Sequence, residues 1–110
     1  MTELPDRMVE LLAQIRAGHT SAQAALLAQI AHGRALAGSY ACVVDELPVT
    51  APVTGPLAGI ALAHKDIFDL QDRWPGCGVQ RGASQVGVQP AAAVKALADA
   101  GASQWATLVM

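Results

Sequence analysis

Apolar residues in the first part of the chain recur at the spacing of an amphipathic helix. Between residues 5 and 17 they return every three or four positions, and Gly18 follows as a typical helix stop. The pattern predicts a first helix over residues 5–17. Its buried face would consist of Met8, Leu11, Leu12 and Ile15.

A second helical pattern is predicted to begin at Thr20. The spacing of Thr20 and Gln23 fits a capping box, in which the two side chains satisfy free backbone N–H groups at a helix start. Gly33 weakens the middle of this helix, and Gly38 is expected to end it. The expected buried stripe consists of Leu26, Leu27, Ile30 and Ala31, while His19 and His32 are expected to be solvated.

The remaining apolar runs are short and typical of strands. Strands are predicted over residues 40–44, 59–64 and 105–110, with a third helix from Pro90 to Gly101 between the last two. This order of helices and strands predicts an α/β fold. The strands on either side of the third helix are expected to be parallel.

Two other stretches are predicted to be loops. Residues 48–56 (PVTAPVTGP) are rich in proline and are expected to lie on the surface. Residues 74–87 are rich in glycine and are expected to be irregular. Their glycines match neither GxGxxG with its flanking strand and helix nor GxxxxGK[ST], so a phosphate-binding loop is not expected there.

Composition and charge narrow the class of protein. The chain has 110 residues, of which 53% are hydrophobic and 15% charged, as is typical of one small folded domain. Alanine dominates the apolar share and aromatic residues make up only 4%, so we expect a thin core whose apolar faces belong to a larger body. The formal net charge is −2 without a basic stripe, which argues against nucleic-acid binding.

Hydropathy and the cysteine positions bear on location and cofactors. No stretch reaches 18 apolar residues and the N-terminus is unlike a signal peptide, so a cytoplasmic protein without a membrane partner is expected. Cys42 and Cys77 lack the spacing of a metal or redox motif and are expected to be reduced thiols, and no cofactor or metal is expected. The last run stops at Met110 without a polar tail. This pattern predicts a truncated chain whose last strand is an unpaired apolar edge that promotes self-association.

The most informative stretch is GPLAGIALAHKDIF, residues 55–68. An almost uninterrupted apolar run ends there in His64, Lys65 and Asp66. Lysine is almost never fully buried unless it is paired or functional. Either Lys65 is a solvated strand end, or the strand delivers its amine into a closed site. Strand alternation puts Ile60, Leu62 and His64 on one face and Ala61, Ala63 and Lys65 on the other.

GPLAGIALAHKD resembles the GPLxGIPxxxKD segment of the amidase signature family. Two further pieces follow in the family's order after a glycine-rich loop: AAAVKALADAGA (91–102) resembles the helix AAVVARLRAAGA, and WATLVM (105–110) resembles the strand LGTLNM. The likeness covers nearly all of the chain. It implies that residues 1–110 are the N-terminal part of a single amidase signature domain, with a helical pair over 1–38 and the start of the α/β core over 39–110.

The resemblance implies a mixed sheet with flanking helices and the hydrolysis of carboxamide C–N bonds. The family uses a serine nucleophile, a bridging serine whose preceding peptide bond is cis, and a lysine. Lys65 matches that lysine, whereas both serines would lie later than Met110. A lysine acts as a base only when neutral, and burial among apolar groups favours the neutral form. The chain alone is therefore expected to be inactive.

The resemblance also sets expectations for partners. The complete enzyme would take a small-molecule amide, and a nucleic acid is expected only if the protein is an amidotransferase subunit that works on charged tRNA. Asp66 is expected to accept backbone N–H bonds in the turn after the strand. Three positions depart from the family pattern: Ala61 replaces a proline, His64 replaces a small aliphatic residue, and Val109 replaces an asparagine.

Other functions remain open at this point. The chain could be a non-catalytic interaction module that docks on a partner through its apolar faces, or a decayed gene product. It could also be an unrelated small α/β domain in which Lys65 is only a solvated strand end. His64 could tune the protonation of the neighbouring amine, or could simply face the opposite side of the strand.

Overall fold

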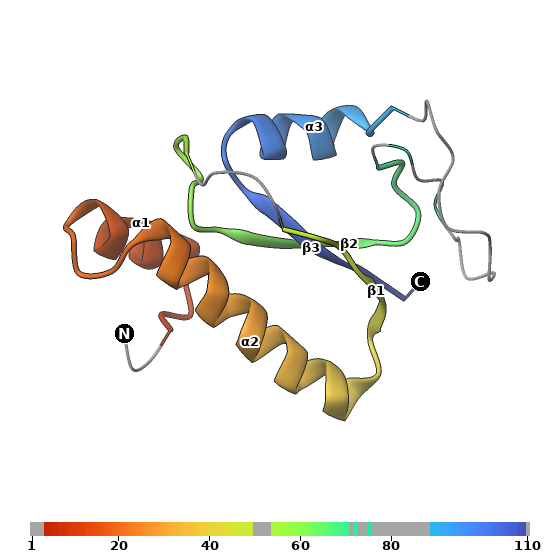
Figure 1. The fold of residues 1–110 in the computed structure, drawn as a ribbon, viewed down its shortest axis with the longest axis horizontal. Helices are drawn as coiled ribbons and strands as arrows, with labels where there is room; N and C mark the ends of the chain where they lie inside the picture. Colours follow the sequence, from red (N-terminus) through yellow and green to blue (C-terminus); the bar gives the residue numbers. More distant parts are fainter. Residues whose placement is uncertain (1–3, 50–53, 71, 73–74, 76–88, 110) are drawn as a thin grey trace.

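The computed structural model describes residues 4–49, 54–70, 72, 75 and 89–109. Within these residues the chain is a mixed α/β structure, as the sequence predicts (Figure 1). Its elements, in chain order, are α1 (Met8–Arg16), α2 (Ala22–Tyr40), β1 (Val43–Glu46), β2 (Ala61–Lys65), α3 (Ala92–Asp99) and β3 (Ser103–Leu108). Residues 50–53 of the predicted loop 48–56, all of the predicted loop 74–87 except Pro75 (and with it Cys77), and Met110 lie outside the described residues.

The three strands form one mixed sheet in the order β1-β3-β2. β2 and β3 are parallel, which confirms the expectation for strands joined through a helix, and β1 is antiparallel to β3. The expectation that the last strand is an unpaired edge is wrong. The chain returns from α2 so that Val43 pairs with Leu108, which makes β3 the central strand and leaves β1 and β2 at the edges. The unpaired edge was the reason to expect self-association. Without it, self-association stays a prediction that no feature of the sheet described here supports.

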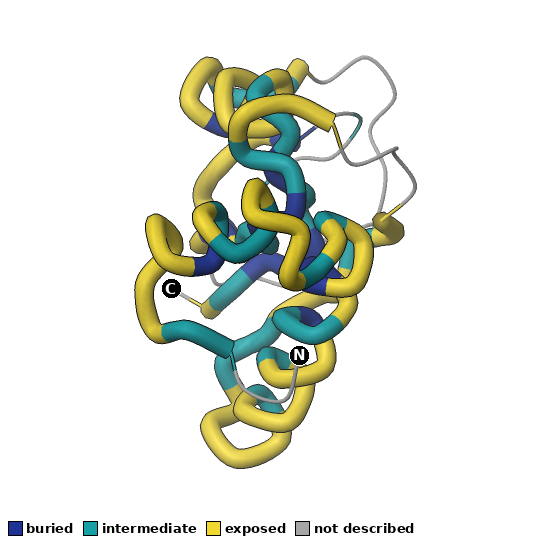
Figure 2. Tube along the Cα trace, turned by 90° about the vertical axis from the view of Figure 1, so that its left-hand side faces the viewer, coloured by how far each residue is buried: buried dark blue, intermediate teal, exposed yellow. Residues whose placement is uncertain are grey.

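Different helices cover the two faces of the sheet. On one face, Leu26 and Ile30 of α2 pack with Trp105 and Ala106 of β3. On the other face lies α3, where Gln104 Nε2 donates to the backbone oxygen of Val94 at 3.5 Å. The sheet is thus the middle of three layers (Figure 1). The buried residues run through this middle layer, and the outer sides of the helices are exposed (Figure 2).

The first helix joins the start of β2 in a second apolar cluster, which consists of Leu11, Ala25, Ile60 and Ala102. Leu11 is the buried residue of α1, and Leu12 and Ile15 are half-buried against the cluster. Met8 is exposed, in contrast to its predicted place on the buried face. The reason is its position in the first turn of α1, at the rim of the contact with the rest of the chain.

The start of α2 differs by one residue from the prediction. Ser21, not Thr20, is the N-cap: its Oγ accepts a hydrogen bond from the backbone N–H of Ala24 at 3.0 Å. A serine and a threonine stand side by side there, and either hydroxyl has the chemistry of a cap.

The end of α2 also differs from the prediction. The helix continues past Gly38 to Tyr40 and ends where Ala41 adopts a left-handed conformation with φ of 50°. Residue 40 is therefore helical, and β1 begins at Val43 instead of Tyr40. Neither a glycine nor an asparagine marks this helix end, so its position has no sequence signal.

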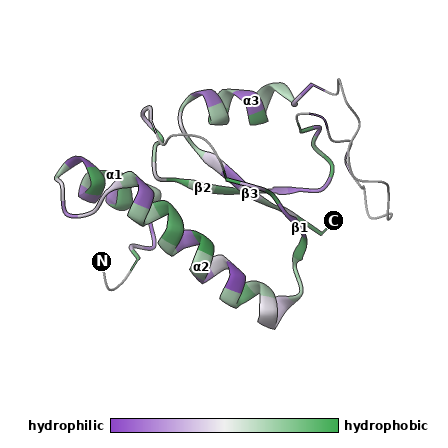
Figure 3. Cartoon of the chain, viewed as in Figure 1, coloured by the Kyte–Doolittle hydropathy of each residue, from purple (hydrophilic) through white to green (hydrophobic). Residues whose placement is uncertain are grey.

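The buried stripe of α2 is narrower than predicted. Ala25, Leu26 and Ile30 are buried, whereas Leu27 and Ala31 are exposed. The helix meets a three-stranded sheet that offers a small apolar face, and residues next to the central stripe reach solvent. The hydropathy of the strands is mixed: the start of β2 is hydrophobic, and its end at His64 and Lys65 is hydrophilic (Figure 3).

Candidate functional site

Lys65 is the last residue of β2 and pairs in register with Leu108 of β3. Because β2 and β3 are parallel, their carboxyl ends meet at the same edge of the sheet. In α/β proteins, ligands bind outside the carboxyl ends of such strands. The structure thus places the lysine that the sequence singled out at the end of the sheet where binding sites form.

The side chain of Lys65 is exposed. Ala63, on the same side of the strand, is exposed as well, and Ala61 is half-buried against the cluster under α2. The alternation predicted for this strand is confirmed. Within the described part of the chain, Lys65 does not lie in a closed apolar site. The surroundings that would favour a neutral amine are therefore not supplied by these residues.

Asp66 follows directly and is buried, with 3% of its surface exposed. Its backbone N–H donates to the oxygen of Leu108 at 2.9 Å, which continues the pairing of the two strands beyond Lys65. Phe68 N–H in turn donates to the oxygen of Lys65 at 3.4 Å, so the chain turns immediately after the strand. A buried aspartate in such a turn fits a structural role. Its expected acceptance of backbone N–H bonds stays a prediction.

His64 faces the opposite side of β2 from Lys65, which was one of the two alternatives for this residue. It is buried, with 9% of its surface exposed, and its ring contacts the ring of Phe68 edge-on, with centroids 6.2 Å apart at 67°. Burial lowers the pKa of His64 below its ordinary value, because the charged imidazolium is poorly solvated there.

Thr107 of β3 is the register partner of His64 and is almost completely buried, with 1% exposed. In the part of the chain that the structure describes, neither Thr107 Oγ1 nor His64 Nε2 has a hydrogen-bond partner. The residue pattern predicted a special position for His64 but not for Thr107. A polar residue in the middle of the apolar run WATLV was the available signal.

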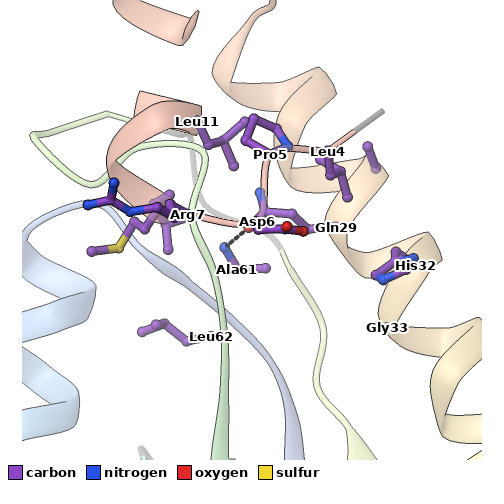
Figure 4. A pocket seen from close by; sticks show the side chains of 13 residues that line it. Leu4, Pro5, Asp6, Arg7, Leu11, Gln29, His32, Gly33, Ala61 and Leu62 are labelled. Atoms are coloured by element: carbon purple, nitrogen blue, oxygen red, sulfur yellow. Dashed lines mark hydrogen bonds between the residues drawn. The ribbon is translucent and has the colours of Figure 1, made fainter. Parts of the chain in front are cut away.

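A pocket of about 890 Å³ lies at the other end of β2, between the start of the chain, α2 and residues 60–62 (Figure 4). Gln29 lies in it and fixes β2 to α2. Its Nε2 donates to the oxygens of Gly59 and Ala25, and its Oε1 accepts the backbone N–H of Ala61 at 3.1 Å. Gln29 was not predicted to be important, because a glutamine on a helix carries no signal for a partner about thirty residues away.

The described residues hold no group of three His, Cys, Asp or Glu side chains that could bind a metal ion. Cys42 is a half-buried free thiol at the start of β1. His19 and His32 are exposed, as predicted. Ser103 begins β3 and donates its backbone N–H to Ile60 at 2.9 Å. Among the described residues, no helix has the length and apolar character needed to cross a bilayer.

Comparison with known proteins gives a structural match. No protein-family model and no curated protein matches the chain, whereas three chains of solved structures do. One belongs to the inhibitor-bound form of a vestigial protein complex that reveals the evolutionary origins of an s-triazine catabolic enzyme. The two structures superpose with a TM-score of 0.76 at 24% sequence identity, over 94% of this chain.

At this level of identity the likeness shows a shared fold and nothing more. The chain spans about a quarter of that neighbour's length, since the match covers 26% of it. Membership of the amidase signature family is therefore not established by these comparisons, and it stays a prediction from the residues.

Proposed function

We propose that this chain forms the N-terminal part of an amidase-signature hydrolase, in which Lys65 is the proton acceptor of a serine, cis-serine and lysine set. The observation that carries the proposal is how the three resembling segments fold together. GPLAGIALAHKD leads into β2, AAAVKALADAGA spans α3, and WATLVM spans most of β3. They form one β-α-β unit with Lys65 at its carboxyl end.

The chemistry assigns one task to this chain. In the complete enzyme, a nucleophilic serine attacks the amide carbonyl and loses its proton to the bridging serine, whose own proton passes to the neutral amine of Lys65. The proton then returns along the same path to the leaving amine as the C–N bond breaks. Both serines lie outside the present sequence, so this chain supplies the base alone.

The exposure of Lys65 sets a condition for this role. Further polypeptide must cover the carboxyl end of β2 to bury the amine and favour its neutral form. The structural neighbour is about four times as long as the matched part and belongs to a protein complex, which is consistent with such a cover. The substrate would be a small carboxamide, and no cofactor is needed for the reaction.

A second candidate is a non-catalytic interaction module. It is favoured by the apolar side chains of Ile67, Phe68 and Val109, which are exposed around the same end of the sheet. The exposure of Lys65 fits this alternative directly, because an interaction module does not need its amine to be covered and neutral. Both candidates predict that the isolated chain binds other polypeptide at this end, and they differ in whether Lys65 takes part in chemistry.

The deciding experiment begins with the coding sequence after codon 110. If the reading frame continues, the longer protein should contain a glycine- and serine-rich segment and should hydrolyse simple carboxamides, and Lys65→Ala should abolish this activity. A stop codon directly after Met110, or a longer protein whose amidase activity is unchanged by Lys65→Ala, would favour the interaction module. Either result would overturn the assignment of Lys65 as the catalytic base.

A further inference from the structure

β2 lies at an edge of the sheet, so every second residue turns its backbone N–H and C=O groups away from β3. Bonds at both ends of the strand show which residues face inward. Directly before β2, the oxygen of Ile60 accepts the N–H of Ser103, and directly after it the N–H of Asp66 donates to Leu108. The residue skipped in the pairing is Trp105 of β3, so the alternation along β2 is unbroken. Even-numbered residues therefore face β3, and odd-numbered residues face outward.

The side chain of Gln29 occupies the outward groups at the amino end of β2 (Figure 4). Its Nε2 donates to the oxygen of Gly59, and its Oε1 accepts the N–H of Ala61 at 3.1 Å. In a parallel ladder, one residue bonds in the same way to the oxygen of residue i and the N–H of residue i+2 on the neighbouring strand. The amide of Gln29 thus stands where a residue of a parallel strand would stand.

The outward groups that follow Gln29 are the oxygen of Ala61, both groups of Ala63 and the N–H of Lys65. The oxygen of Lys65 accepts the N–H of Phe68 at 3.4 Å, which closes this row at the carboxyl end. Among the described residues, β3 is the one strand that pairs with β2. β2 contains neither a proline nor a bulge, the features that commonly keep an edge strand from pairing.

This row of groups matches a parallel strand. The first residue of a parallel segment of about three residues would donate to Ala61 and accept from Ala63, and its third would donate to Ala63 and accept from Lys65. An antiparallel strand would exchange both bonds with Ala63, but its next pairs need the N–H of Ala61 and the oxygen of Lys65. Gln29 and Phe68 already bond those two groups. A second copy of β2, related by a two-fold axis, would be antiparallel and fits poorly for this reason.

Two observations identify the occupant. Parallel strands are joined by crossovers of a dozen or more residues, so the added strand needs further polypeptide, and the matched part of the solved neighbour is 26% of that chain. The pocket of about 890 Å³ lies beside Gln29, where the added strand begins, and Leu4, Leu11 and Leu62 are among its lining residues. An apolar residue at the start of the strand suits this lining.

We propose that the outer side of β2 receives a parallel strand from the polypeptide that follows residue 110 in the complete protein. The strand begins beside Gln29 with an apolar residue in the pocket, and ends beside Lys65. The proposal shares with the proposed function the premise of a longer protein, but it does not depend on amide hydrolysis. If that function holds, the added strand is the first part of the cover over Lys65.

Amide hydrogen exchange measured by NMR tests this pairing. In the 110-residue chain, the Leu62 and His64 amides should be protected because they face β3, whereas the Ala63 and Lys65 amides should exchange freely. In the longer protein, exchange at Ala63 and Lys65 should slow by at least about tenfold. Unchanged exchange at these two amides in the longer protein, or protection of Ala63 in the short chain, would overturn the proposal. Cross-strand nuclear Overhauser contacts give the direction of the added strand, and an antiparallel one would also contradict it.

Carboxamide hydrolysis, measured on the same longer protein, separates this proposal from the proposed function. Hydrolysis that depends on Lys65, in a protein whose Ala63 amide still exchanges freely, would overturn the added strand alone. Protection of Ala63 in a protein whose hydrolysis is unchanged by Lys65→Ala would overturn the catalytic base and support the strand.

Proline substitutions give an independent check. Ala63→Pro removes an outward N–H and needs an extended residue before it, which Leu62 already is, so the short chain should keep its fold. The control Leu62→Pro removes an N–H that faces β3 and should unfold it. In the longer protein, the ring in Ala63→Pro blocks the added strand, and the Lys65 amide should lose its protection. Retained protection of Lys65 in this variant would overturn the proposal, and if Ala63→Pro does not fold, the exchange rates of the unaltered protein decide.

Discussion

Gly33 of α2 lies directly against the indole of Trp105 in β3. A β-carbon added at Gly33 would come within 2.5 Å of Trp105 Cζ2 and 3.0 Å of Cη2. From the sequence alone, Gly33 is expected only to weaken the middle of the helix. The structure gives the same residue a packing role, because the missing side chain lets the helix approach the only tryptophan within the described residues.

This contact predicts opposite effects for two glycine substitutions in one helix. Gly33→Ala should lower the free energy of unfolding by about 1 kcal/mol or more, because the strain of overpacking against Trp105 exceeds the gain in helix propensity. Gly38→Ala has nothing within 4 Å of the new methyl group and should raise it, by up to about 1 kcal/mol. Urea unfolding curves of both variants would test this. A stabilised Gly33→Ala variant would contradict the packing role.

Gln29 should matter more than any exposed glutamine of α2. Gln29→Met keeps the length of the side chain but leaves the oxygen of Gly59 and the N–H of Ala61 without their partner, at a cost of about 1–3 kcal/mol. Gln23→Met, at an exposed position of the same helix, should change stability by less than about 0.5 kcal/mol. Thermal unfolding gives the stability, and faster exchange of the Ala61 amide would locate the loss. Equal losses of stability in Gln29→Met and Gln23→Met would contradict the role of Gln29 in fixing β2 to α2.

The capping residue of α2 can be identified by a matched pair of variants. Ser21→Ala removes the acceptor of the Ala24 N–H and should destabilise the chain by about 1 kcal/mol. Thr20→Ala removes only a 3.5 Å contact from its hydroxyl to the oxygen of Ser21 and should have a smaller effect. Denaturant titration of both variants decides between them. A larger loss in Thr20→Ala would restore the capping box that the sequence suggested.

Types of secondary structure were predictable here, and several borders were not. The spacing of Leu26 and Ile30 identifies a helix because one face of it must be apolar wherever it packs. The end of α2 at Tyr40 was not predictable, since Gly38 offered an earlier stop that the chain does not use and Ala41, which takes the left-handed conformation, is not a residue typical of that position. The pairing of β1 with β3 joins residues sixty or more positions apart, and local periodicity holds no information about it.

The candidate site divides in the same way. Strand alternation correctly separated His64 from Lys65, since neighbouring side chains of a strand point to opposite faces. Exposure of Lys65 could not be predicted, because it depends on what covers the carboxyl end of β2 and not on the strand itself. The residue that pairs in register with His64 on β3 could not be predicted either. Thr107 becomes significant only when the parallel register brings it beside the imidazole.

The remaining prediction concerns Lys65 and distinguishes the two functions. The isolated chain should show no turnover of carboxamides, because its described residues bring no serine and base together at the end of β2. In the longer protein that contains both serines, Lys65→Ala should lower kcat by several powers of ten, as expected for groups that act as a unit. Lys65→Arg should be nearly as damaging, since a guanidinium does not release its proton at working pH.

A matched control is available on α3. Lys95 is an exposed lysine paired with Asp99, and Lys95→Ala should leave kcat within about twofold of the unaltered enzyme. Circular dichroism would show that each Lys65 variant keeps its fold. If Lys65 is only a solvated strand end, both of its variants should behave like Lys95→Ala. A Lys65→Arg enzyme that retains more than about a tenth of its kcat would rule out the catalytic role, because the loss would then be under about 1.4 kcal/mol of barrier.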